Sequence, residues 1–134
     1  MGPRWRPEKF RWRWVIVAIL LVVGGHVGAY RALGPELVRL LEADRILVAF
    51  ALATGTALGI YFLGGLVVGR MSTGHTTREP AVASLISLIL ICGLQFRMGM
   101  INIVGLLVGA PFCFGASYLG AWVGEKWQHV ATRR

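Results

Sequence analysis

Four long apolar runs divide the chain, and charged segments separate them. The runs are Trp14–Tyr30, Ile46–Gly69, Ala81–Phe96 and Met98–Gly124, with 17, 24, 16 and 27 residues. A membrane-spanning helix needs about 20 apolar residues, and flanking arginines lengthen a shorter one because their side chains reach the interface. The pattern therefore predicts an all-α membrane protein with four transmembrane helices. We place the spans at about 14–33, 46–69, 80–96 and 98–124.

Only Arg97 interrupts the apolar block from residue 80 to residue 124. A single helix of that length would exceed the bilayer thickness about twofold. Arg97-Met98-Gly99 is therefore predicted to be the tight turn of a helical hairpin, so the four helices form two hairpins. We expect one transmembrane domain over 14–124, with a basic arm at 1–13 and a basic tail at 125–134.

The basic residues are distributed unevenly about the predicted spans. Ten of the 14 lie on the side of the arm, the middle loop and the tail, and four lie on the other side. The first group is Arg4, Arg6, Lys9, Arg11, Arg13, Arg70, Arg78, Lys126, Arg133 and Arg134, and the second is Arg31, Arg39, Arg45 and Arg97. Because basic loops stay cytoplasmic, we expect both termini on the cytoplasmic side of the inner membrane.

The first span also allows a second interpretation. A basic segment, an apolar stretch and the small residues Val27-Gly28-Ala29 resemble a signal peptide with its cleavage site. The apolar segment is long for a signal peptide, and three further runs follow it. We favour an uncleaved first span, and cleavage stays the alternative.

Composition supports the membrane class and limits the others. The chain is 56% hydrophobic and 15% charged, whereas a soluble domain has about 25% charged residues. The net charge of +8 follows the predicted topology instead of one polar face, so we expect anionic lipid as a partner and no nucleic acid.

Glycines are spaced for close helix packing. Pairs four residues apart place two glycines on one helix face, which lets another backbone approach. The predicted packing positions are Gly24, Gly28, Gly55, Gly59, Gly65, Gly69, Gly105, Gly109, Gly120 and Gly124. These faces exceed what one compact bundle needs, so we expect a homo-oligomer or a larger membrane complex. The repeat Leu63-Gly-Gly-Leu-Val67 and Leu119-Gly-Ala-Trp-Val123 favours two related hairpins.

Two connecting segments have recognisable patterns. Gly34-Pro35 is a helix-start signal within 31–45, which predicts a short interfacial helix or an extension of the second span. The middle loop has a capping box, Thr76-x-x-Glu79, followed by Pro80. The same loop is a candidate site for a phosphate or a partner, with Arg70, Ser72, His75, Arg78 and Glu79 as its residues.

The sequence offers little chemistry inside the membrane. No carboxylate lies within a predicted span, which argues against proton coupling and paired-carboxylate hydrolysis. The three histidines lack ligand spacing, and no nucleophile has a base, so we expect no enzyme, no metal and no cofactor. One candidate polar cluster lies at the outer side: His26, Gln95, Arg97 and Asn102.

Two resemblances follow from these segments. The stretch Gly69–Ala81 resembles a G-x-x-S-x-G-x-x-x-x-E-P-A loop of small bacterial multi-span membrane proteins, which implies an inner-membrane protein and no particular activity. Gly24–Arg31 resembles the early G-G-x-x-G-A-x-x-R motif of a fluoride-channel-like family, with the arginine one position early. That family's pore asparagine and its T-T-F-S-T-F segment have no counterpart here, so no pore residue is carried over.

We therefore expect a small integral membrane protein that serves as a structural, accessory or assembly subunit. The alternative is a small oligomeric channel or solute transporter, which the outer polar cluster and a mid-span proline, Pro111, favour.

Overall fold

The chain folds into four α-helices, as a computed structural model shows for residues 11–72, 78–97 and 103–131. The helices are α1 (Trp12–Glu42), α2 (Ile46–Met71), α3 (Arg78–Arg97) and α4 (Ile103–Ala131). Three segments of the described chain are long and apolar enough to cross a membrane, namely α1, α2 and Leu107–Gln128 of α4. The all-helical prediction is confirmed for these parts. The third predicted span, 80–96, corresponds to α3, which is not one of the three.

Helix α1 differs from its predicted boundaries. It continues through Gly34 and Pro35 to Glu42, so the interfacial helix predicted at 31–45 is the end of the first helix. The prediction that this segment begins a new helix or extends the second span is wrong. Pro35 removes only one backbone donor, and the residues after it, Glu36 to Glu42, are strong helix formers apart from one valine.

The chain turns between α1 and α2 at residues 43–45. The N–H of Arg45 donates to the carbonyl of Leu40 at 2.9 Å, and the N–H of Asp44 donates to that of Leu41 at 3.1 Å. This pair of bonds is a Schellman motif, whose left-handed position is usually glycine. Asp44 occupies that position with φ of 56°, since a short polar side chain tolerates the left-handed region. The turn thus ends α1 without a glycine.

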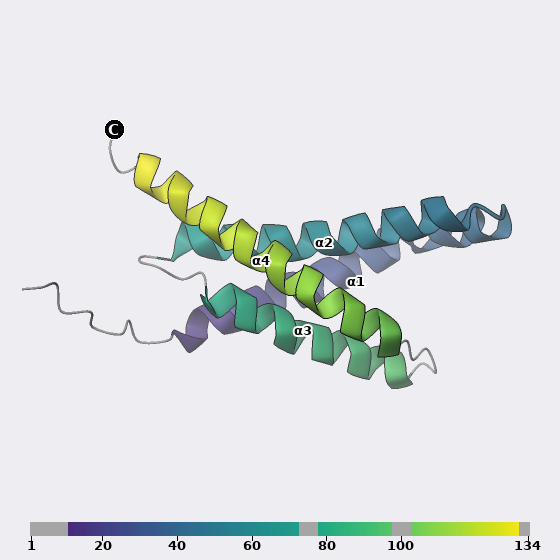
Figure 1. The fold of residues 1–134 in the computed structure, drawn as a ribbon, viewed down its shortest axis with the longest axis horizontal. Coiled ribbons are helices and arrows are strands. Elements are labelled where there is room, and N and C mark those ends of the chain that lie inside the picture. The colour runs from purple at the N-terminus through teal and green to yellow at the C-terminus, as the bar shows by residue number, and fades with distance from the viewer. Residues whose placement is uncertain (1–10, 73–77, 98–102, 132–134) are drawn as a thin grey trace, which may run out of the picture.

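Helices α2 and α4 share the most extensive contact in the described structure. Figure 1 shows α4 crossing α2 and then diverging from it towards the end where α1 turns into α2. Helix α1 packs on α2 and α3, and α3 packs on α4, while α2 and α3 touch only slightly. The four-helix bundle is therefore organised around the α2–α4 crossing.

Four glycines make this crossing close. A Cβ atom added at Gly65 or Gly69 would overlap the backbone carbonyl of Ser117 or Ala121 on α4. In return, a Cβ atom at Gly120 would overlap the carbonyl of Phe62 on α2, and one at Gly124 would lie 2.5 Å from that of Leu66. Each helix thus presents two glycines and two carbonyl oxygens to the other. The two copies of the predicted sequence repeat meet at this contact.

The distribution of side chains is inverted relative to a soluble protein. Large apolar residues are exposed on every helix, with Leu20, Leu47, Ile89 and Leu107 each at least 67% exposed. The fully buried residues are mostly small or hydroxylic, such as Ala83, Ser84, Ser87 and Ser117. Small and hydroxylic interiors are typical of helices that pack inside a lipid bilayer, where apolar side chains have no reason to leave the surface.

The α2–α4 contact predicts a specific sensitivity to added volume. We expect Gly65→Ala to lower the free energy of unfolding by about 2 kcal/mol or more, because the methyl group must displace the backbone of α4. The matched control is Gly93→Ala, since no described atom lies within 4 Å of the Cβ position there and Gly93 is outside the predicted packing pairs. Thermal unfolding in a mild detergent measures both. Equal stability of the two variants would contradict the close approach.

Candidate interaction surfaces

The ends of all four helices at one side of the molecule form a basic and aromatic surface. The beginnings of α1 and α3 and the ends of α2 and α4 lie at this side (Figure 1). The Arg70 guanidinium lies 5.9 Å from the centre of the Trp127 ring, and the Lys126 ammonium lies 3.6 Å from that of Trp122. Cations held over tryptophan faces are stabilised by the ring quadrupole. Arg70 and Lys126 both belong to the group of ten basic residues that the sequence places on one side of the spans.

The candidate loop site of the middle segment is divided between a buried part and an exposed part. Ser72 is fully buried, and its N–H closes α2 by donating to the Val68 carbonyl at 2.9 Å. Glu79 is 5% exposed and accepts a hydrogen bond at 3.3 Å from the backbone N–H of Arg11. Arg70 and Arg78 are exposed, and His75 lies outside the described residues. Glu79 therefore links the beginning of α3 to that of α1, Ser72 closes its own helix, and among the described residues of this site the two arginines face outwards.

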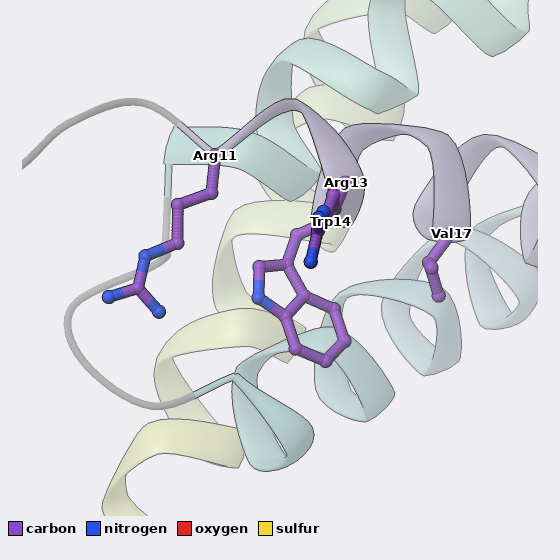
Figure 2. Close-up of a pocket in the computed structure, with 4 residues that line it drawn as sticks. All are labelled: Arg11, Arg13, Trp14 and Val17. Atoms are coloured by element: carbon purple, nitrogen blue, oxygen red, sulfur yellow. The ribbon is translucent and has the colours of Figure 1, made fainter.

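A cavity opens beside the beginning of α1. Its volume is about 640 Å³, and Arg11, Arg13, Trp14 and Val17 line it. Figure 2 shows Arg11 and Trp14 extending to the same side of the chain, with Val17 one turn further along the helix. From the sequence alone both arginines contribute only to the predicted topology, because a cavity at the beginning of a helix has no local sequence signal.

The outer polar cluster is described only at His26. Its Nδ1 atom lies 2.9 Å from the Val22 carbonyl one turn earlier, and its ring packs edge-on against Tyr61 with centroids 5.3 Å apart. His26 thus contacts α2 in the part of the chain that the structure describes. The side chains of Gln95 and Arg97, and all of Asn102, lie outside it, so the cluster stays a prediction.

Two buried hydroxyl groups have no hydrogen-bond partner among the described residues. They belong to Tyr61, which packs with Val22 and Cys113, and to Ser87 on α3. Other buried hydroxyls are satisfied, since Ser84 donates to the Ala81 carbonyl at 2.7 Å and Ser117 donates to that of Pro80 at 2.9 Å. The sequence carries no distinct signal for this set, because serines at helical spacing are typical of ordinary packing positions. Cys92 and Cys113 are both free thiols.

The predicted packing glycines fall into two groups. Gly65, Gly69, Gly120 and Gly124 lie at the α2–α4 contact described above. The second group has no described atom within 4 Å of the Cβ position and consists of Gly24, Gly28, Gly55, Gly59 and Gly109. Gly105 is outside the residues whose surroundings the structure describes. Half of the predicted set therefore leaves open space on the surface of this single chain.

Comparison with known proteins adds no family assignment, since no family model, curated protein or solved structure matches the chain. Within the described residues, no group of three or more histidine, cysteine or acidic side chains is placed to hold a metal ion. The proposed function therefore rests on the surfaces described above.

The buried hydroxyls predict opposite effects of two similar substitutions. We expect Ser117→Ala to lower the free energy of unfolding by about 1 kcal/mol, because the bond from α4 to the Pro80 carbonyl is lost. We expect Tyr61→Phe to leave stability unchanged or to raise it, because the buried hydroxyl makes no strong hydrogen bond among the described residues, where the weakly bonding Cys113 thiol packs beside it. Denaturant titration in detergent measures both. A larger loss for Tyr61→Phe would show that the hydroxyl has a partner.

Proposed function

We propose that the chain is a four-span protein of the bacterial inner membrane that serves as a structural, accessory or assembly subunit. The three apolar helices and the exposed large apolar side chains support a bilayer environment. Helix α3 supplies the fourth span in this proposal. Its 20 residues extend about 30 Å, which is the thickness of the hydrocarbon core.

The basic and aromatic surface supports an orientation with both termini in the cytoplasm. Arg13, Arg70, Arg78 and Lys126 lie at the ends of the four helices on that surface. The opposite end carries Arg31, Arg39 and Arg45 together with three acidic residues, and Arg39 lies 3.6 Å from Glu36 there. An excess of cations on one side is what retains that side in the cytoplasm.

The open glycines are the observation that carries the assembly role. Where two helices of this chain approach closely, they do so at paired glycines, as at Gly65 and Gly120. Gly55 and Gly59 have the same spacing on the same helix and no described neighbour at the Cβ position. In a bilayer, close backbone contact is a main source of helix association. We infer that these positions receive a helix of a second copy or of another membrane subunit.

Assembly at the open face of α2 is testable with a matched pair of variants. We expect Gly55→Leu combined with Gly59→Leu to reduce the oligomer to a smaller species, because the side chains fill the approach path at positions where no described atom lies within 4 Å of the Cβ position. Gly93→Leu is the control, since its Cβ position is equally open but outside a predicted pair. Light scattering after gel filtration in a mild detergent gives the mass. A wild-type chain that is monomeric and purifies without a partner would overturn the proposal.

A small channel or solute transporter is the second candidate, and the unsatisfied hydroxyls of Tyr61 and Ser87 favour it. Polar groups left without partners inside a bundle are available to water or a polar solute. Under the accessory proposal, we expect proteoliposomes to show no selective ion flux above that of protein-free liposomes. A selective flux that His26→Leu or Asn102→Leu abolishes would favour the channel, and a mock-purified sample controls for contaminants.

A further inference from the structure

The cavity at the beginning of α1 has the size of a ligand site. Its volume of about 640 Å³ is within the range of small-molecule pockets, about 300–1,000 Å³. It lies at the basic and aromatic surface, where the proposed orientation places the headgroups of the cytoplasmic leaflet. Neither the proposed topology nor the proposed assembly role involves this cavity.

The polar side of the cavity suits an anion. Arg11 and Arg13 both have exposed side chains, and guanidinium groups match the oxygens of a phosphate with paired hydrogen bonds. The beginning of α1 already has a carboxylate beside it, because the buried Glu79 accepts the backbone N–H of Arg11, the N-cap residue. The attraction for an anion at this cavity therefore comes from the two arginine side chains.

The other side of the cavity is apolar and directed into the bilayer. Trp14 and Val17 are half-buried and pack against the cluster of Val15, Ala18, Val68 and Ala83. Val17 lies three residues after Trp14, which is about 4.5 Å deeper along the helix. Tryptophan is enriched at the membrane interface because its ring is apolar and its N–H is polar. An apolar wall below two arginines fits a ligand that has both a charged headgroup and an acyl chain.

We propose that this cavity binds the phosphodiester headgroup of an anionic phospholipid. Arg11 and Arg13 hold the phosphate oxygens, and Trp14 and Val17 lie along the glycerol and the first methylene groups. The inference rests on the proposed membrane orientation and goes beyond it, because it assigns a discrete site to a lipid class. Inorganic phosphate offers the same anionic oxygens without the chain, and the experiment separates the two.

Native mass spectrometry of the full-length chain in a neutral detergent tests the site, by titration with phosphatidylglycerol, phosphatidylcholine and inorganic phosphate. We expect phosphatidylglycerol to bind more tightly than phosphatidylcholine, and phosphate at millimolar concentration not to displace it. Arg11→Gln and Arg13→Gln should each weaken phosphatidylglycerol binding about tenfold, and Arg13→Lys should weaken it less. Trp14→Ala should weaken both lipids, because it removes the apolar wall.

Lys126→Gln is the matched control, since it also removes an exposed cation beside a tryptophan at the same end of the molecule. We expect it to change phosphatidylglycerol binding less than twofold. An equal loss for Lys126→Gln and Arg13→Gln would show general surface attraction and overturn the site, and displacement by phosphate alone would overturn its assignment to lipid. If Arg13→Gln inserts and assembles as the wild type does and binds the lipid unchanged, this inference fails while the proposed function stands.

Discussion

The contact between α2 and α4 determines how the rest of the chain is arranged. Glycines on each helix face backbone carbonyls on the other, Gly65 towards Ser117 and Gly120 towards Phe62. Contacts of this kind bring Cα–H groups against carbonyl oxygens and align backbone dipoles at short range. They need no large buried side chain. The large apolar residues are therefore left on the outside, where lipid is their natural neighbour.

The same contact explains which hydroxyl groups are satisfied. Because α4 lies so close to α2 at Ser117, that side chain points to the other side and reaches the Pro80 carbonyl at the start of α3. Ser117 of α4 thus contacts α2 through its carbonyl oxygen and α3 through its hydroxyl group. Tyr61 and Ser87 have no such geometry among the described residues. Their hydroxyls are the places where the packing is incomplete.

Much of the helical architecture follows from the sequence, because four apolar runs and glycine spacing are local signals. The choice among glycine pairs is not local. Gly55 and Gly59 have the same spacing as Gly65 and Gly69, yet only the second pair meets α4, since the crossing point of two helices depends on contacts along their whole length. The sequence also does not predict that α1 extends through Pro35, because a proline is compatible with either a helix start or an internal position.

The position of the closed glycines has a consequence for assembly. Gly65, Gly69, Gly120 and Gly124 all lie in the half of the bundle nearest the basic surface, whereas Gly55 lies in the other half of α2 and Gly59 lies near the middle of that helix. In that second half α4 diverges from α2 (Figure 1), so no intramolecular contact of the same closeness forms between them. Helix association in a bilayer gains from close backbone contact wherever it is offered. The chain forms such contact internally between α2 and α4 near the basic surface, and the proposed assembly would use the open positions Gly55 and Gly59. The proposed lipid cavity is at the basic end of the bundle, whereas Gly59 and Gly55 lie 12 and 16 residues along α2 from that end, so each can be altered by substitution without directly changing the other.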